Sequence, residues 1–146
     1  MTMQLDSQKT AARAKEIYTN GLCCSEAIVY ALAEAKNPEK AIDYMKMASG
    51  LCGGMGVESA CGVVTGGACG IGIYLGRDSL EKAQEVKCSG ISKQFVNGFR
   101  SVFNETGCKE LKALIPEGQP QRDYCAVLVE KGTELAADII NRNNSK

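Results

Sequence analysis

The sixteen residues from Ala60 to Leu75 are almost entirely apolar and include five glycines. Gly62, Gly66 and Gly70 recur every four residues, so they lie along one side of a helix. Each glycine costs a helix ~1 kcal/mol relative to alanine. A helix tolerates such a row of glycines where a neighbouring helix or a bound cofactor approaches its backbone closely. We favour the first explanation, close packing against a neighbouring helix. A membrane span needs ~20 apolar residues, and this run of sixteen is too short to form one. We therefore expect a glycine-rich helix at the centre of a globular protein.

The remaining helices are predicted from apolar residues spaced three and four apart, with helix-breaking residues between them. Gly50–Gly56 is predicted to be a glycine-rich loop, Ile115–Gln121 is predicted to be a linker, and no segment has the pattern of a strand. The sequence thus predicts an all-α fold, a compact bundle of about six helices in one domain over residues 1–146. Besides the glycine-rich helix, the expected helices cover about 6–19, 22–34, 38–48, 78–104, 108–114 and 123 onward.

Composition excludes several classes of function. Seventeen basic residues balance seventeen acidic ones, so neither a nucleic-acid-binding face nor a membrane-surface patch is expected. The polar N-terminus has no apolar signal-peptide core, which predicts a cytoplasmic protein. The chain contains no histidine. Any chemistry must therefore use sulfur and carboxylate groups.

Eight cysteines are the main candidates for that chemistry. In the cytoplasm they are expected to be reduced thiols, metal ligands or redox groups rather than permanent bridges. No two stand three apart as C-x-x-C, the pair needed by thioredoxin-like dithiols, zinc knuckles, rubredoxin-type sites, ferredoxin runs and haem attachment. A cysteine site must therefore be assembled by the fold from distant segments.

Four cysteines are predicted to open helices: Cys24, Cys61, Cys108 and Cys125. Helix N-termini present unpaired N–H groups and a partial positive charge, which lower the pKa of a cysteine. If the four ends converge, they form a pocket that favours thiolates. The alternative is four unrelated thiols and no site.

The other four cysteines are weaker candidates for such a site. Cys69 and Cys88 fall on apolar helix faces and are predicted to lie in the core. Cys23 and Cys52 are candidates for an accessory ligand or a resolving thiol. Glu26 and Glu58 are interpreted as charges at helix starts and not as catalytic groups.

The chain resembles a family of redox-active proteins named after a C, GCAxxG, C, C cysteine pattern. The matching residues are G-x-x-C-S-E-A at 21–27, GGMG at 53–56, C-G-x-x-x-G at 61–66, Gly107-Cys108 and Cys125. The family motif reads CGAxxG, and here Val63 stands in the alanine position. The resemblance implies that the defining cysteines are Cys24, Cys61, Cys108 and Cys125, the same four selected by their helix positions.

The domain is also similar to part of the split-Soret cytochromes, which carry a cysteine-bound iron–sulfur centre beside their haems. Haem is not expected here, because its attachment motif and histidine ligands are missing. The favoured hypothesis is an electron-transfer protein that binds a [2Fe–2S] cluster through the four cysteines, with Cys52 as a further candidate ligand. Its redox partner protein is unknown, and a homo-oligomer is compatible with the sequence.

Three alternatives stay open. The first is a cofactor-free dithiol enzyme in which Cys61 attacks and Cys24 or Cys108 resolves the mixed disulfide. The second is a structural Zn²⁺ site formed by the same four cysteines. The third is a helical interaction module without a site.

Overall fold

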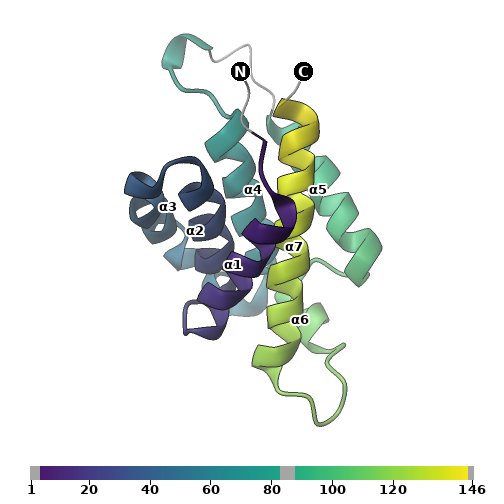
Figure 1. Cartoon of the computed structure of the whole chain (residues 1–146). Helices are drawn as coiled ribbons and strands as arrows, with labels where there is room; N and C mark the ends of the chain where they lie inside the picture. The colour runs from purple at the N-terminus through teal and green to yellow at the C-terminus, as the bar shows by residue number, and fades with distance from the viewer. Residues whose placement is uncertain (1–3, 83–87, 145–146) are drawn as a thin grey trace.

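The computed structural model describes residues 4–82 and 88–144 and confirms the all-α fold. Figure 1 shows the helices packed side by side, with the long C-terminal helix along the front of the bundle. The described residues form seven α-helices, each within or overlapping one of the seven expected ranges. They are α1 (Ser7–Thr19), α2 (Cys24–Lys36), α3 (Ala41–Met47), α4 (Gly62–Leu75), α5 (Cys88–Phe103), α6 (Cys108–Lys112) and α7 (Gln121–Asn144).

The helix starts follow local capping chemistry. Asp6 caps α1 by accepting a hydrogen bond from the Lys9 backbone N–H at 3.0 Å. Helix α2 begins at Cys24 and not at Leu22, because Cys23 occupies the N-cap position and the Glu26 carboxylate accepts from the Cys23 N–H at 3.0 Å. This reciprocal arrangement resembles a capping box, with a cysteine in place of the usual serine or threonine.

The long helix predicted from residue 78 was wrong in its first part. A single 3₁₀ turn covers Leu80–Lys82, and α5 begins at Cys88. The part of the prediction that covers residues 83–87 lies outside the described residues. The apolar spacing that suggested a helix is confirmed from Cys88 onward, where Phe95 and Phe99 are fully buried.

Helix α4 lies at the centre of the bundle and packs against α2, α5 and α7. Its glycine ridge faces α2. A Cβ on Gly66 would stand 2.5 Å from Ile28 Cγ2 and 3.0 Å from the Ser25 carbonyl oxygen, and a Cβ on Gly70 would overlap Leu32. The prediction that the ridge permits close helix packing is therefore confirmed.

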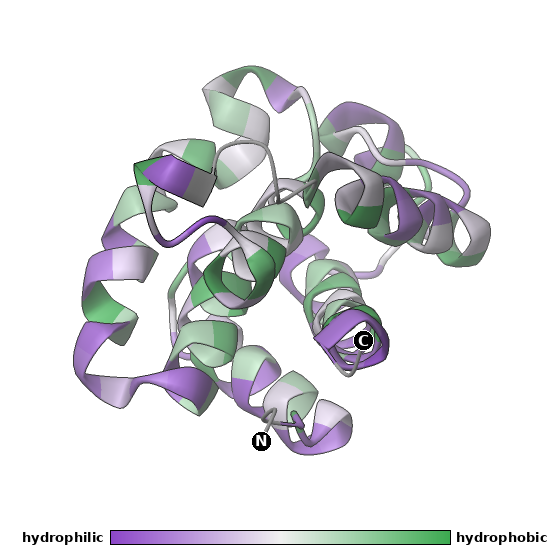
Figure 2. Cartoon of the chain, turned by 90° about the horizontal axis from the view of Figure 1, so that it is seen from above, coloured by the Kyte–Doolittle hydropathy of each residue, from purple (hydrophilic) through white to green (hydrophobic). Residues whose placement is uncertain are grey.

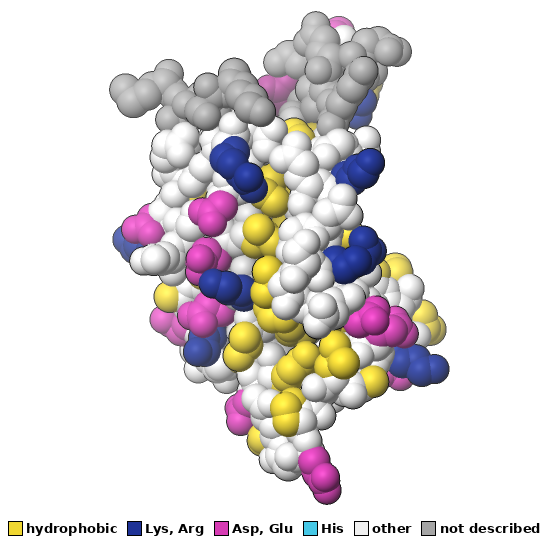
Figure 3. Space-filling view, turned by 90° about the vertical axis from the view of Figure 1, so that its right-hand side faces the viewer, with side chains coloured by type: hydrophobic (Ala, Val, Ile, Leu, Met, Phe, Trp, Pro, Cys, Tyr) yellow, Lys and Arg dark blue, Asp and Glu magenta, His cyan; other side chains and the backbone are white. Residues whose placement is uncertain are grey.

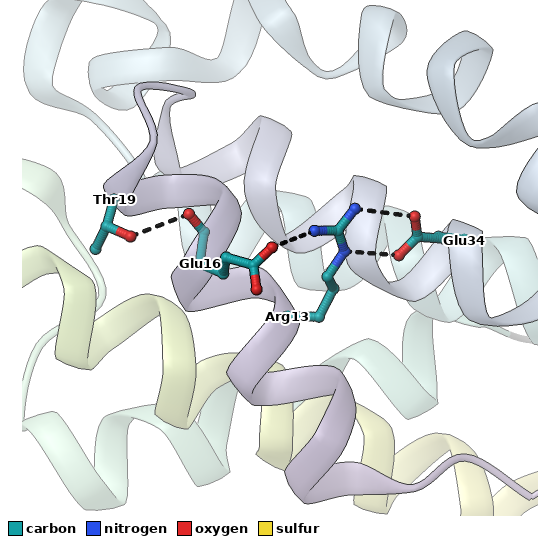
Figure 4. A network of polar contacts seen from close by, with 4 residues as sticks. All are labelled: Arg13, Glu16, Thr19 and Glu34. Atoms are coloured by element: carbon teal, nitrogen blue, oxygen red, sulfur yellow. Dashed lines mark hydrogen bonds and ion pairs between the residues drawn. The ribbon is translucent and has the colours of Figure 1, made fainter.

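Helix α1 and the residues before it are held to α2 and α7 by polar contacts. The Leu5 backbone exchanges two hydrogen bonds with the Asn141 side chain, at 2.8 and 2.9 Å. Figure 4 shows Arg13 of α1 reaching Glu34 of α2 with two N–H groups, at 2.9 and 3.1 Å. Arg13 also pairs with Glu16 on its own helix at 2.5 Å. These contacts fix α1 beside α2 and α7.

Apolar residues are turned toward the neighbouring helices and polar ones toward the outside, as Figure 2 shows from above. On the face drawn in Figure 3, basic and acidic side chains are interspersed around a band of apolar groups, in keeping with the zero net charge. Within the described part of the chain, no helix combines the length and the apolar character needed to cross a membrane.

The segment predicted to be a glycine-rich loop has a defined conformation. Ser49–Leu51 forms a 3₁₀ turn, and Gly53–Gly56 follows as a left-handed turn with φ values of 65, 63, 60 and 77°. Left-handed backbone costs an ordinary residue ~1–2 kcal/mol, and glycine adopts it freely. Three of the four residues are glycine, which explains the GGMG sequence.

Candidate functional site

A cavity of about 150 Å³ lies where the starts of α2, α4 and α6 meet the first turns of α7. Its walls carry the four cysteines selected from the sequence: Cys24, Cys61, Cys108 and Cys125. All four have free thiols. The fold therefore brings together four residues that are up to 101 positions apart in the chain, from residue 24 to residue 125.

Cys24 is the first residue of α2, and two close approaches hold its sulfur. The sulfur lies against the backbone of Gly62, where a Cβ would overlap it. The backbone N–H groups of Ser25 and Gly53 lower the pKa of this thiol, against the larger effect of burial. The left-handed turn thus contributes a polar group near the sulfur, and the first glycine of the α4 ridge leaves room for it.

A short antiparallel bridge joins the segments that carry Cys61 and Cys108. It pairs Ala60 with Gly107. The Cys61 N–H donates to the Thr106 carbonyl at 2.8 Å, and the Cys108 N–H donates to the Ser59 carbonyl at 2.6 Å. This bridge fixes the start of α4 relative to the start of α6, so the two cysteines are positioned as a unit.

Cys125 does not open a helix, and that prediction was wrong. Helix α7 begins at Gln121, directly after Pro120, so Cys125 lies in its second turn. Its surroundings differ from those of the other three, because the nearby Tyr18 hydroxyl lowers the pKa of this thiol against the larger effect of burial. Sequence reasoning did not identify Tyr18, since in sequence it is one of several apolar positions on α1.

The predicted thiolate-favouring pocket was also wrong for the metal-free protein. Burial raises the pKa of all four thiols, and for Cys61, which is only 6% exposed, it raises the pKa to about 12. Backbone N–H groups act in the opposite direction at Cys24 and Cys61. The cost of placing an anion in an apolar cavity is the larger effect.

Two cations lie on the cavity wall. Lys112 pairs with Glu58 at 3.1 Å and lowers the pKa of Cys108 and Cys125 against the effect of burial. The Arg122 guanidinium lies 3.9 Å from the centre of the Tyr18 ring and donates to the Tyr18 and Leu22 carbonyls. Glu58 and Glu110 oppose the effect of Lys112 at Cys108, so the positive charge at the wall is partly compensated.

Cys23 and Cys52 form a disulfide, with Cα atoms 5.9 Å apart. Cys23 lines the cavity, but Cys52 does not. Together with Glu26 the two sulfurs form a separate group whose ligand atoms lie within 4.8 Å of one another. Cys69 is exposed, so its predicted position in the core was wrong. The run from Ala60 to Leu75 is apolar on all sides, so the sequence did not indicate which face of the helix points to solvent. Cys88 is partly buried and packs on the core from the first position of α5.

Comparison with known families gives one match. Residues 22–139 match the family described as "Putative redox-active protein (C_GCAxxG_C_C)". The chain belongs to this family. The searches of the curated proteins and of the solved structures found no match. The match spans all four cavity cysteines and the left-handed turn.

The structure gives a physical reason for most of the C_GCAxxG_C_C pattern in this chain. Gly62 leaves room for the Cys24 sulfur. Gly54 is buried, and a Cβ there would overlap the Ser59 backbone and stand 3.0 Å from Cys108 Cβ. The glycines of the pattern therefore allow the cysteine-bearing segments to approach one another. Val63 is fully buried, and its Cγ1 fills the space over Gly132 of α7.

Proposed function

We propose that Cys24, Cys61, Cys108 and Cys125 hold a small iron–sulfur cluster, with [2Fe–2S] as the favoured form, and that the protein transfers electrons to or from a redox partner protein. The observation that carries this proposal is that four free cysteines from four separate segments line one cavity. Thiolate ligation is the usual ligation of such clusters. Membership of a family described as redox-active agrees with it.

The residues around the cavity fit this group. The donors are sulfur only, since the chain has no histidine. Backbone N–H groups near Cys24 and Cys61 lower the pKa of these thiols, and such groups stabilise anionic sulfur ligands. Lys112 and Arg122 supply positive charge at the wall. When bound, the cluster would supply one-electron chemistry, and these residues would set how readily it is reduced.

The spacing of the sulfurs favours a cluster over a single zinc ion. With Zn–S bonds of ~2.3 Å, tetrahedral ligation needs all four sulfurs within about 3.8 Å of one another. Among the described residues, no three of the four cavity sulfurs lie within 4.8 Å of one another. A group with more than one metal ion spreads its ligands farther apart, as this cavity does.

A cofactor-free dithiol enzyme has less support from the same residues. Its attacking group would be the thiolate of Cys61. That thiol is buried and its pKa is raised to about 12. A thiol that stays protonated at neutral pH is a poor nucleophile.

Anaerobic purification with iron and sulfide analysis tests the proposal. We expect about two iron and two sulfide per chain, with visible charge-transfer absorption, for a [2Fe–2S] form. Replacing any one of the four cysteines with serine should reduce iron to less than half. Cys69→Ser is the matched control, because Cys69 is exposed and remote from the cavity lining. Less than one iron per chain after careful anaerobic handling would exclude the cluster.

A further inference from the structure

The Cys23–Cys52 disulfide lies beside the four-cysteine cavity and has no part in the function proposed above. It is the one bridge among the described residues, and the other six cysteines of the chain are free. A protein that is stabilised by disulfides in an oxidising compartment has most of its cysteines paired. A single bridge among six free thiols does not fit that pattern.

The fold holds the two bridged segments together without the disulfide. The buried Ser25 hydroxyl donates to the Ala48 carbonyl at 3.0 Å. The Ser49 hydroxyl donates to the Glu26 carboxylate at 2.7 Å. Because these contacts join the start of α2 to the segment before Cys52, the two sulfurs would stay near each other after the bond opens.

The residues around the Cys23–Cys52 bond are compatible with both the disulfide and the reduced dithiol. Both cysteines are partly exposed and Gly53 beside Cys52 is exposed, so a thiol from outside can reach the bond. Ser25 Oγ lies 3.3 Å from the Cys23 sulfur and 3.6 Å from the Cys52 sulfur, which offers each thiol a polar partner once the bond is opened. Gly53 has a φ of 65°, so the chain turns sharply away immediately after Cys52.

We propose that Cys23 and Cys52 are a reversible dithiol/disulfide couple that exchanges two electrons with a dithiol. A thiolate of the dithiol attacks Cys52 Sγ and forms a mixed disulfide, while the Cys23–Cys52 bond breaks and its electron pair stays on Cys23 Sγ, which takes a proton from solvent. The second thiol of the dithiol then attacks the mixed disulfide and releases Cys52 as a thiol. The protein gains two electrons and two protons, and the dithiol leaves as a disulfide.

Cys52 is the sulfur open to attack, because it lies outside the cavity and next to the exposed turn. Cys23 is the sulfur displaced, because it faces the cavity and is less open to a thiol from outside. Cys23 also lines the cavity and precedes Cys24 in the chain. The couple therefore lies at the wall of the proposed cluster site, but its chemistry does not depend on a cluster.

Redox equilibration of the full chain tests the couple. The protein is incubated in mixtures of reduced and oxidised dithiothreitol, quenched with acid and alkylated, and the labelled peptides are measured by mass spectrometry. A chelator is included, because the Glu26 carboxylate and the two sulfurs lie within 4.8 Å of one another and could hold a metal ion once reduced. We expect Cys23 and Cys52 to become labelled together at intermediate ratios, while circular dichroism shows an unchanged helix content.

Two variants sharpen the result. Cys69→Ser should leave the transition unchanged, and Cys52→Ser should abolish it, with Cys23 labelled at every ratio. A bond that stays closed in excess dithiothreitol until the protein unfolds would overturn the proposal, as would full labelling of both thiols in air-oxidised protein. Cys52→Ser should also keep the iron content of the unmodified protein, since Cys52 does not line the cavity. Failure of the couple is thus distinguishable from failure of the cluster.

The order of attack has its own test. In Cys23→Ser the remaining Cys52 thiol should react with glutathione disulfide, measured on the peptide that contains Cys52 because the exposed Cys69 can react too. In Cys52→Ser the remaining Cys23 thiol, measured on its own peptide, should react at least about 10-fold more slowly, because it faces the cavity and is less accessible. Equal rates in the two variants would overturn the assignment of Cys52 as the attacked sulfur.

Discussion

At the scale of single residues, Cys61 shows how two opposing effects on a thiol are resolved. It occupies the N-cap of α4, and the backbone N–H groups of Val63 and Val64 lower its pKa. Burial acts in the opposite direction and is the larger effect, so the pKa rises to about 12. Binding a metal must therefore displace protons from buried thiols, and the metal-free cavity is a set of protonated sulfurs.

The reactivity of individual thiols in the metal-free, reduced protein should follow this balance. With iodoacetamide at neutral pH we expect Cys69, which is exposed, to be alkylated fastest and Cys61 slowest, by at least about 100-fold. Only the thiolate reacts. The rate at Cys61 should therefore keep rising with pH toward about 12, while an unperturbed thiol levels off near its ordinary pKa of 9.0. Time-resolved alkylation with mass spectrometry gives both quantities.

Alkylation in urea is the control, since the difference between Cys61 and Cys69 should vanish once the chain is unfolded. If Cys61 in the folded protein reacts faster than Cys69 at pH 7, the helix N-terminus outweighs burial and our account of the cavity is wrong.

At the scale of elements, the sequence predicted those helices whose ends have strong local signals. Helix α1 follows a capping aspartate and α4 ends before Gly76, and both were placed within two residues. Residues 80–82, predicted to belong to the α5 helix, form a 3₁₀ turn instead, because capping groups such as Asp78 and Ser79 suggested an earlier helix start and no proline contradicted it. The start of α7 was placed too late, because Asp123 was chosen as the cap over Pro120.

The candidate site was partly predictable for the same reason. Its four cysteines could be selected from motif and position, but their convergence depends on tertiary contacts such as the Ala60–Gly107 bridge. The left-handed turn at Gly53–Gly56 could not be told from a flexible loop, because glycine is compatible with both. The Cys23–Cys52 pairing has no signal in the spacing of the cysteines, since a bridge depends on where the fold places the two segments.

The α4 glycines provide an element-scale prediction about the site. A Cβ on Gly62 would overlap the Cys24 sulfur and stand 3.1 Å from the Ser25 backbone N. We expect Gly62→Ala to lower the free energy of unfolding by about 1–3 kcal/mol and to reduce bound iron. A Cβ on Gly72 of the same helix would have no neighbouring atom within 4 Å. Gly72→Ala should therefore be neutral or stabilise by up to ~1 kcal/mol, with iron unchanged.

Urea unfolding of the metal-free variants and iron analysis of the loaded ones measure the two effects. A double-mutant cycle identifies the cause, because Cys24→Ala should recover part of the stability lost in Gly62→Ala if the sulfur is what the new methyl group meets. Equal behaviour of Gly62→Ala and Gly72→Ala would show that α4 and α2 do not approach as closely as the structure indicates.

At the scale of the whole molecule, the site lies at one border of the hydrophobic core, which extends well beyond it. The core is formed by fully buried side chains along α2, α4, α5 and α7, among them Ile28, Ile71, Phe95 and Ile140. Cys61 is the one member of the cavity tetrad that belongs to the buried core cluster. The chain is long enough to be stable through this core alone, whereas the cavity ties together segments from residue 24 to residue 125.

Removal of the bound metal should therefore loosen the protein without unfolding it. We expect the metal-free chain to keep its helical circular dichroism, because the core does not include the metal. Loading at a hundredfold excess over the dissociation constant should stabilise the fold by about 2.7 kcal/mol, which corresponds to a rise in Tm of roughly 5–10 °C for a chain of this size. Cys61→Ser should show no rise on loading, and Cys69→Ser the full rise. An unfolded metal-free chain would mean that the four cysteines and their metal, and not the α4 core, hold the helices together.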